Sequence, residues 1–508
     1  MLEKLSPVVK LRNYFHLPYD SAIAAARTCY SPRVVEAAEI TDKQRDSIGQ
    51  VTFDGGHHTV FQHPHFEFGL ENVSRQFVWN FLHGHPFYNS EQTSQRYVRM
   101  DEIKVFVPPL EEALRQKYED CVRFQWDCYH RLSALLRKDT YEILGNIWHL
   151  QTHPHEKKRK KVERESEKKA IETARYVIPI GAMTTMVHTV SGIVLHRLNR
   201  MQQTGDTPYE TSLVIREMVR CVKEVDSSFF ERIGDPPREK EEIPESCFQH
   251  GHEDCAREFD ARLGNLTSRL IDYSLTAESV VADAFRIAMG RSRGEMSDDE
   301  AIEWMLDPHK NPYRLDKLNV SFHAPLMKPL HHAYYTFVKK ISHTADSQDQ
   351  RHRMVPASRP LMTVTDSRRP DYVTPEIVRR NREALSLYRE AMEKAWETKN
   401  YLVDRGVPAE FALYVLPNAL CVRMVESSSL LYLMHKWVMR TCLNAQWEIY
   451  QASMEELAQV SRVHPRLTRH IGPPCSFRVG VAAPICTEGA HFCGLPVWKL
   501  FPDVERRL

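Results

Sequence analysis

The 508-residue sequence lacks a long apolar run, a strong net charge and a regular cysteine framework. Without about eighteen consecutive apolar residues, no membrane-spanning helix is predicted. Its 68 Lys and Arg residues are balanced by 67 Asp and Glu residues, so no overall field attracts nucleic acid or a membrane surface. The N-terminal residues form neither a secretory core nor a lipidation motif. Its 11 cysteines suit reduced thiols or metal ligands, and we expect a cytoplasmic protein.

The sequence contains an internal repeat. Residues 10–32 and 269–290 each read as a short apolar strand, a turn and an Ala-rich helix. Each is followed, in one order, by a histidine-bearing segment, an Arg-containing motif and a strand ending in Pro, Tyr176–Pro179 or Tyr414–Pro417. Landmarks matched in order predict tandem homologous domains, which a Pro-rich, charged stretch would connect. We place the domains at 1–238 and 262–508, with a linker at 239–261.

A basic run occupies residues 153–170 of the first domain. Its Lys and Arg side chains could contact nucleic acid. Interleaved glutamates and the lack of aromatic residues favour a solvated helix or loop insert instead. We therefore expect no nucleic-acid partner.

Two polar clusters lie roughly one domain length apart. Ser94-Gln95-Arg96-Tyr97 stands in the first half and Arg351-His352-Arg353 in the second. A nucleotide phosphate is dianionic, and binding it away from water takes several forked Arg donors together with hydroxyl or backbone donors. Each cluster could supply such donors, but a cluster of this kind alone is more often solvated surface charge.

Together the two clusters resemble the two ends of one signature of the flavin-dependent thymidylate synthases, Arg-His-Arg followed at a fixed distance by Ser-x-Arg-Tyr. The first domain keeps the Ser-x-Arg-Tyr end, with Gly84-His85-Pro86 in place of Arg-His-Arg. The second keeps Arg351-His352-Arg353, with Leu361 and Thr363 at the Ser and Arg positions. The losses are complementary.

Other segments resemble the same family. Residues 56–63 are similar to its Gly-His-x-Ser/Thr-x-x-Glu-His segment, with Gln62 for Glu, and Arg175–Pro179 is similar to its Arg-x-x-Leu-Pro. Arg440 followed by Asn444–Ile449 is similar to its Arg-x-x-x-His-Ala-Gln-Trp-Glu-Ile, with Asn for His. Leu413 stands where the second domain would carry its own strand Arg.

The resemblance implies one composite site, because family members build each site between subunits. We expect deoxyuridylate (dUMP) to bind Gln92, which replaces the usual Glu, and Ser94, Gln95, Arg96 and Arg175 of the first domain, together with Gln348, Arg351 and Arg440 of the second. Arg351 and Gln348 are also the catalytic candidates. The flavin candidates are His57, Thr59, His323, Arg351, His352, Arg353 and Asn444.

The resemblance also implies an activity and an assembly. The reaction is the reductive methylation of dUMP to dTMP, with methylenetetrahydrofolate as carbon donor, reduced FAD as hydride source and NADPH as reductant. The implied fold is α+β: two tandem domains form a pseudodimer, each with a central twisted sheet, flanking helices and long helical arms. Two chains would pair as a homodimer. The alternatives are a non-catalytic nucleotide- or flavin-binding scaffold, or the methylation of another pyrimidine nucleotide.

The C-terminal tail carries Cys475, Cys486 and Cys493 in a Pro- and Gly-rich stretch, with His464, His470 and His491 nearby. Three thiolates and one imidazole, for which His470 is the candidate, would suit a structural zinc ion. Plain free thiols are the alternative. Cys247, His250, His252 and Cys255 form a weaker candidate near the linker.

Overall fold

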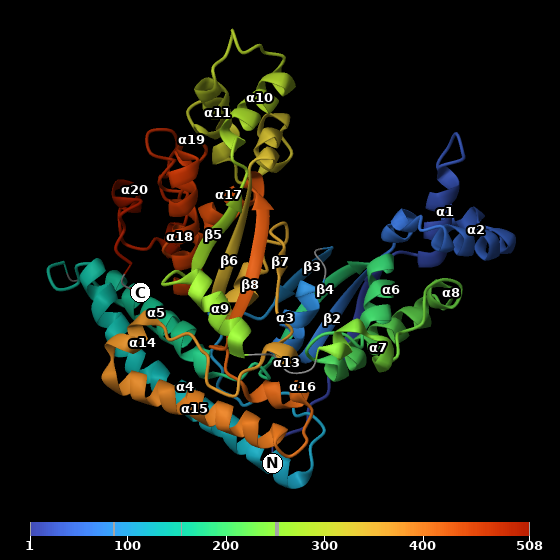
Figure 1. The fold of residues 1–508 in the computed structure, drawn as a ribbon, viewed down its shortest axis with the longest axis horizontal. Helices are drawn as coiled ribbons and strands as arrows, with labels where there is room; N and C mark the ends of the chain where they lie inside the picture. The colour runs from blue at the N-terminus through green and yellow to red at the C-terminus, as the bar shows by residue number, and fades with distance from the viewer. Residues whose placement is uncertain (1, 85–86, 154, 249–252, 507) are drawn as a thin grey trace.

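The computed structural model describes residues 2–84, 87–153, 155–248, 253–506 and 508, and their arrangement is shown in Figure 1. The protein is a mixture of helix and sheet, with two four-stranded antiparallel sheets ordered β1-β2-β4-β3 and β5-β6-β8-β7. The strands are β1 (Val8–Tyr14), β2 (His65–Ser74), β3 (Tyr88–Gln92), β4 (Met183–Ser191), β5 (Ser268–Tyr273), β6 (Tyr334–Ser342), β7 (Ala357–Ser358) and β8 (Cys421–Ser429).

The predicted strand and helix at the start of each half are confirmed. Strand β1 precedes α1 (Pro18–Thr28), and β5 precedes α10 (Ala277–Met289). Helix α10 ends at Gly290, whose φ of 63° is left-handed. Glycine adopts this conformation at a helix end without the steric cost that a Cβ would bring.

Each sheet buries one face beneath helices. In β2, Phe66, Phe68 and Leu70 alternate with more exposed residues and pack against α6 (Gly192–Met201) and α7 (Pro208–Val225), as the period of two in a strand requires. In β6, Tyr335 and Phe337 pack against α17 (Leu430–Arg440) and α18 (Trp447–Val463). The two halves therefore have separate sheet cores.

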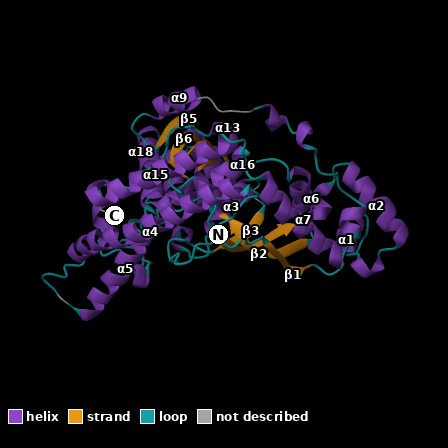
Figure 2. Cartoon of the chain, turned by 90° about the horizontal axis from the view of Figure 1, so that it is seen from below, coloured by secondary structure: helices purple, strands orange, loops and turns teal. Residues whose placement is uncertain are grey.

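A layer of long helices joins the halves. It consists of α4 (Glu112–Ile147), α5 (Glu156–Ala174) and α15 (Arg382–Val403), and α4 and α15 run side by side (Figures 1 and 2). Tyr118 of α4 and Trp396 of α15 belong to one hydrophobic cluster that draws residues from both halves. The halves thus share a core beneath the sheets.

The predicted strands ending at Pro179 and Pro417 are wrong. Aromatic and β-branched residues favoured strands there, but each segment begins as a 3-10 turn that continues the preceding helix, η3 (Arg175–Val177) or η9 (Leu413–Val415). The chain then becomes extended, and the two segments pair with each other. The Ile180 N–H donates to the Leu416 carbonyl at 2.8 Å, and the Asn418 N–H donates to the Ile178 carbonyl at 2.8 Å.

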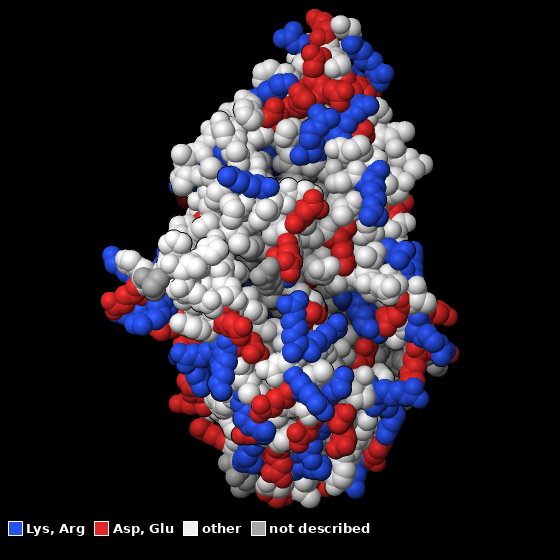
Figure 3. Space-filling model, turned by 90° about the vertical axis from the view of Figure 1, so that its left-hand side faces the viewer, with Lys and Arg blue, Asp and Glu red and all other residues white. Residues whose placement is uncertain are grey.

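Most of the basic run lies on helix α5, so of the two predicted forms, helix or loop, it is a helix. Val162, Ala170 and Ile171 are buried on the face that packs along α4. Its charges pair along the helix, as in the contact of 2.7 Å between Lys160 and Glu156. Lys and Arg side chains are interspersed with Asp and Glu over one face of the molecule (Figure 3).

The predicted linker contains η4 (Lys240–Glu242), η5 (Pro244–Cys247) and the start of α9 (Glu253–Leu263). Asp260 of α9 forms an ion pair with Arg423 of β8 at 2.7 Å, so this helix is bound to the second sheet.

Among the described residues, no helix is long and apolar enough to cross a membrane. The remaining helices are α2 (Asp42–Asp54), α3 (Arg75–His83), α8 (Ser228–Glu231), α11 (Asp298–Leu306), α12 (His343–Asp349), α13 (Met362–Thr365), α14 (Glu376–Arg380), α16 (Ala409–Ala412), α19 (Pro465–Thr468) and α20 (Val497–Leu500).

Two matching buried contacts connect the halves. Tyr176 donates its hydroxyl to Glu448 at 2.8 Å, and Glu448 also accepts from the Ser342 hydroxyl at 2.7 Å. On the other side, the Tyr414 hydroxyl donates to Glu210 at 2.6 Å, and Glu210 accepts from the Ser74 hydroxyl at 2.6 Å. Each carboxylate is thereby satisfied by one residue from either half, as a buried acid requires.

Candidate active site between the two halves

The structure brings the two predicted phosphate-binding groups together. Arg96 donates from Nη2 to the Asn444 carbonyl at 2.8 Å, although the two residues are far apart in the sequence. Arg440 donates from Nη2 to the Gln348 carbonyl at 3.1 Å, and the charges of Arg96 and Arg351 lower the pKa of Arg440 in addition to burial. Residues from both halves therefore surround one cationic region.

A chain of hydrogen bonds fixes the amide groups of this region. Gln348 donates to the Gln446 side chain at 2.7 Å, and Gln446 donates to the Tyr176 hydroxyl at 2.5 Å. Tyr176 follows Arg175 directly, so this chain ties the second-half glutamine to the first-half arginine. Sequence reasoning missed Gln446 and Tyr176, although both stand inside the motifs that it quoted.

The remaining predicted dUMP-binding residues of the first half lie on β3 and the turn after it. The Ser94 hydroxyl accepts from the Arg96 N–H at 3.3 Å. Gln95 is buried, and its side-chain oxygen accepts from Asn418 at 3.2 Å. Gln92 accepts from the buried Arg75 at 2.9 Å. The two glutamine oxygens are therefore already engaged by protein donors.

Arg351 and Arg353 reach across to the first sheet. Arg351 makes a bidentate ion pair with Glu91 of β3, both distances being 2.9 Å, and both side chains are exposed. Arg353 donates to the Asn89 side chain at 3.2 Å and lies over the Tyr88 ring, 5.2 Å from its centroid. The Arg-His-Arg segment thus spans the gap between the halves.

His352, between these arginines, is half-buried and uncharged. Its Nε2 accepts from Arg440 Nε at 2.9 Å. Burial and the adjacent Arg440 hold the pKa of His352 well below its ordinary value. It therefore acts as a neutral hydrogen-bonding group that fixes Arg440.

Glu172 is the main anion of the cationic region. It accepts from Arg96 Nε at 2.5 Å and from Lys169 at 3.3 Å. Burial alone would raise the pKa of this carboxyl, but Lys169, Arg96 and Arg175 lower it to about 2. Sequence reasoning missed Glu172, whose only signal is its place one turn before Arg175 on α5.

Positive charge exceeds negative charge around Glu172. Arg175 is only 4% exposed, and its buried Nη2 has no hydrogen-bond partner among the described residues. Burial is the main reason that its pKa falls to about 10, and the neighbouring Arg96 lowers it further. Buried cations without enough counter-charge are costly, so this region would gain from an added anion such as a phosphate.

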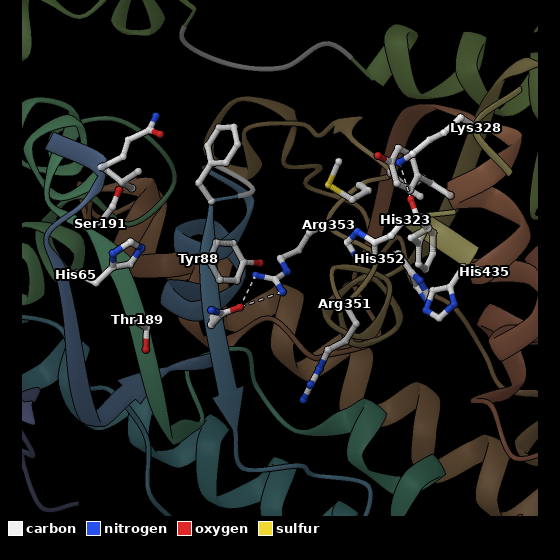
Figure 4. A pocket seen from close by; sticks show the side chains of 18 residues that line it. His65, Tyr88, Thr189, Ser191, His323, Lys328, Arg351, His352, Arg353 and His435 are labelled. Atoms are coloured by element: carbon white, nitrogen blue, oxygen red, sulfur yellow. Dashed lines mark hydrogen bonds between the residues drawn. The ribbon is translucent and has the colours of Figure 1, made fainter. Parts of the chain in front are cut away.

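A large cavity of about 810 Å³ is lined by Arg351, His352 and Arg353. It adjoins the cationic region because His352 contacts Arg440. Figure 4 shows side chains of both halves facing it. Phe322 and Tyr432 supply rings, while Arg351, Arg353 and Lys328 supply positive charge. Its size and its mixture of rings and cations fit a large planar cofactor with an anionic diphosphate. The labelled residues are His65, Tyr88, Thr189 and Ser191 of the first half, and His323, Lys328, Arg351, His352, Arg353 and His435 of the second.

The predicted flavin residues fall into two groups. His323, Arg351, His352 and Arg353 line the cavity. His57 and Thr59 are exposed and are not among the lining residues, and Gln62 and His65 line it instead. The Asn444 amide donates to Glu488 at 2.9 Å and to the His491 carbonyl at 2.8 Å, so it faces the C-terminal tail.

The zinc site is not supported. Among the described residues, no group of three or more His, Cys, Asp or Glu side chains is placed to hold a metal ion. Burial raises the pKa of Cys475 to about 11 and that of Cys493 above its ordinary value, and Cys475, Cys486 and Cys493 are free cysteines. Burial lowers the pKa of His470, and its carbonyl accepts from Arg314 at 2.6 Å. His85, Pro86, His250 and His252 lie outside the described residues.

Comparisons with known proteins point to one family. The family model described as thymidylate synthase complementing protein matches residues 10–226 and again residues 269–466. A flavin-dependent thymidylate synthase of Sulfolobus acidocaldarius is 31% identical over 216 residues, 41% of this chain and 77% of that protein. One of Geobacter sulfurreducens is 33% identical over 196 residues, 38% of this chain and 81% of that protein.

Two antiparallel sheets flanked by helices, with an arginine cluster and a large cavity between them, define an α+β protein with a cationic site between its halves. The matched segments cover most of both halves. This chain belongs to the family of flavin-dependent thymidylate synthases.

Proposed function

We propose that this protein is a flavin-dependent thymidylate synthase that methylates dUMP at one composite site, built from two tandem domains (1–238 and 262–508) arranged as a pseudodimer. One observation carries the proposal. Arg175, whose buried Nη2 has no partner among the described residues, and its neighbour Arg96 come from the first half, and Gln348 and Arg440 come from the second. The named family members at 31% and 33% identity support the reaction class.

The phosphate of dUMP would bind between Arg96, Arg175 and Arg440, with the Ser94 hydroxyl as a further donor. Arg351 would then face the pyrimidine. Its exposed pair with Glu91 is no obstacle, because surface ion pairs of this kind contribute only about 0–1 kcal/mol. A charge-assisted contact with the substrate can replace it.

A flavin would occupy the large cavity, where Arg353 and Lys328 suit its diphosphate and His323, His352 and the Phe322 ring line the wall. The flavin, when bound, supplies hydride chemistry that amino-acid side chains cannot. The protein's own residues would do the positioning. Neutral His352 holds Arg440, and Gln348 is held by Gln446, so both second-half groups are fixed before a ligand arrives.

We further propose that methylenetetrahydrofolate is the carbon donor and NADPH the reductant, and that two chains form a homodimer. The homodimer follows because a site within one chain leaves the family's second subunit interface exposed. Analytical ultracentrifugation tests it, and a concentration-independent monomer would contradict it.

The test of the function is a flavin count followed by turnover. Purified protein should hold one FAD per chain and form dTMP from dUMP, methylenetetrahydrofolate and NADPH. Two flavins per chain would contradict the single composite site. If the protein binds flavin and converts another pyrimidine nucleotide but not dUMP, that nucleotide is the substrate. If it neither binds flavin nor turns over a nucleotide, it is a non-catalytic scaffold.

A further inference from the structure

The C-terminal tail beyond residue 466, which the family match does not include, reaches the phosphate end of the proposed site. Arg506 of the tail donates from Nη2 to the Ala445 carbonyl at 2.7 Å, one residue from the Asn444 carbonyl that Arg96 contacts at 2.8 Å. The two arginines therefore hold adjacent carbonyls of the loop between α17 and α18.

The tail is fastened to the first half on the way to this loop. Phe492 packs edge-on against Trp148, with ring centroids 5.9 Å apart, and its carbonyl accepts from Lys161 at 3.2 Å. Asn444 bonds both Glu488 and the His491 carbonyl. These contacts fix the tail near residues 488–492, and Arg506 is placed by its own bond to Ala445 and by the Tyr450 ring, whose centroid lies 4.6 Å from the guanidinium.

Glu172 and a substrate phosphate would compete for the same arginine. Glu172 accepts from Arg96 Nε at 2.5 Å. A phosphate that takes the Nε–Nη2 edge of Arg96 in a forked arrangement uses that donor. Two anions on one guanidinium repel each other, and a buried carboxylate that loses its partner is strongly disfavoured. Glu172 would then keep only Lys169, at 3.3 Å, and would gain from a second donor when the phosphate arrives.

Arg506 offers that donor. Its Nη1 is buried and has no acceptor among the described residues, while its Nε and Nη2 bond the carbonyls of Leu508 and Ala445. Glu172, Lys169 and Arg506 line one small cavity of about 40 Å³. This exceeds the roughly 10–15 Å³ that a single water needs, so a carboxylate group has room to rotate.

We propose that Arg506 is a positioning residue of the phosphate site: it receives the Glu172 carboxylate, together with Lys169, when an anionic substrate group takes Arg96. The inference rests on the proposed function. It makes the tail part of substrate binding, although Arg506 itself need not touch the phosphate.

The experiment compares dUMP with deoxyuridine, which lacks the phosphate, by isothermal titration of the full-length protein. Arg506→Gln should weaken dUMP binding by about tenfold and leave deoxyuridine binding unchanged, because one charge-assisted bond is lost only in the phosphate complex. In a Glu172→Gln background the carboxylate no longer needs a new partner, so Arg506→Gln should then have no effect. Arg469→Gln, on an exposed tail arginine paired with Glu303, is the matched control and should match the wild type.

Each other outcome overturns the proposal. An equal loss in both backgrounds means that Arg506 contacts the phosphate directly or merely supports the fold. No loss in either background means that Glu172 does not use it. If Glu172→Gln does not fold, Arg506→Lys tests the proposal instead. This variant should retain dUMP affinity within about threefold, because the charge remains. A loss of affinity equal to that of Arg506→Gln overturns the proposal. Wild-type protein that binds dUMP no better than deoxyuridine overturns the proposed function as well, whereas an unaffected Arg506→Gln with normal dUMP binding leaves that function intact.

Discussion

Arg175 should destabilise the unliganded protein while it binds the substrate. Its pKa of about 10, against an ordinary 12.5, reflects burial first and the charge of Arg96 second, only partly offset by Glu172. Arginine remains charged at neutral pH, so the difference corresponds to roughly 3 kcal/mol of unfavourable free energy in the folded state. Replacing it with Met keeps the length of the side chain and removes the charge.

We expect Arg175→Met to increase the free energy of unfolding by about 1–3 kcal/mol, since part of the gain is lost with the bond from Nε to the Glu172 carbonyl at 3.2 Å. The same change should weaken dUMP binding by about tenfold to a hundredfold, because hydrogen bonds to a charged group contribute about 1.5–3 kcal/mol. Urea titration monitored by circular dichroism gives the first quantity and calorimetric titration gives the second.

Arg286→Met is the matched control. Arg286 is 3% exposed and lies between Asp283 and Asp298 at 2.5 and 2.8 Å. Its loss should destabilise the protein by about 1–2 kcal/mol, because Asp298 loses its guanidinium while Asp283 keeps Arg293, and should not change dUMP affinity. Either of two results would contradict this prediction: Arg175→Met destabilises the protein as Arg286→Met does, or Arg175→Met binds dUMP as tightly as the wild type.

Three further predictions concern the site and the fold. Arg96→Ala and Arg351→Ala should each reduce kcat/KM for dUMP by about a hundredfold, and the double variant should lose little more, because both serve one site; additive losses in steady-state assays would indicate two sites. Burial raises the pKa of Glu210 to about 7 from 4.5, so the folded state keeps a proton that the unfolded chain releases; the resulting stability, up to roughly 3 kcal/mol, is present below pH 4.5 and lost as the pH rises through 7. Glu210→Gln should flatten this slope in chemical denaturation between pH 5 and 8 by about the same free energy, and an unchanged slope would contradict it. Treatment with a zinc chelator should leave the melting temperature unchanged, and a clear fall in differential scanning fluorimetry would reveal a metal that the described side chains do not indicate.

The sequence predicted which arginines matter better than it predicted how they are held. The resemblance to the family's motifs predicts Arg96, Arg175 and Arg440 as phosphate ligands, and arginine is the residue type that a phosphate favours. It could not identify Glu172 as their common counter-ion. That role depends on helix α5 packing along α4, whereas composition alone indicated a solvated helix or loop insert.

Two other differences between the sequence-based predictions and the structure also arise from tertiary packing. Asn444 matches a family motif, but its side chain bonds the tail, which lies outside the family match. Tyr176 and Tyr414 stand in segments that have strand composition. Each nevertheless forms the last turn of a helical region, because the segment that follows pairs with its counterpart in the other half. Tertiary pairing overrides local propensity at such positions.

The two junctions between the halves separate what maintains the fold from what serves a ligand. The contact of Tyr, Glu and Ser is present twice, as Tyr176 with Glu448 and as Tyr414 with Glu210. Both copies are buried and fully bonded. The arginine is present once: Leu413 stands before Tyr414 where Arg175 stands before Tyr176.

The difference in cost explains this asymmetry. The bonded Tyr and Glu stabilise either junction without a ligand, whereas a buried arginine with a free Nη2 is unfavourable until an anion arrives. The second junction, with Leu413 at the equivalent position, avoids this unfavourable charge. The cluster of Arg175, Arg96 and Arg440 on one side only supports the phosphate-bearing substrate that we propose for that junction, and the stability gained by Arg175→Met measures how strongly the empty site is disfavoured.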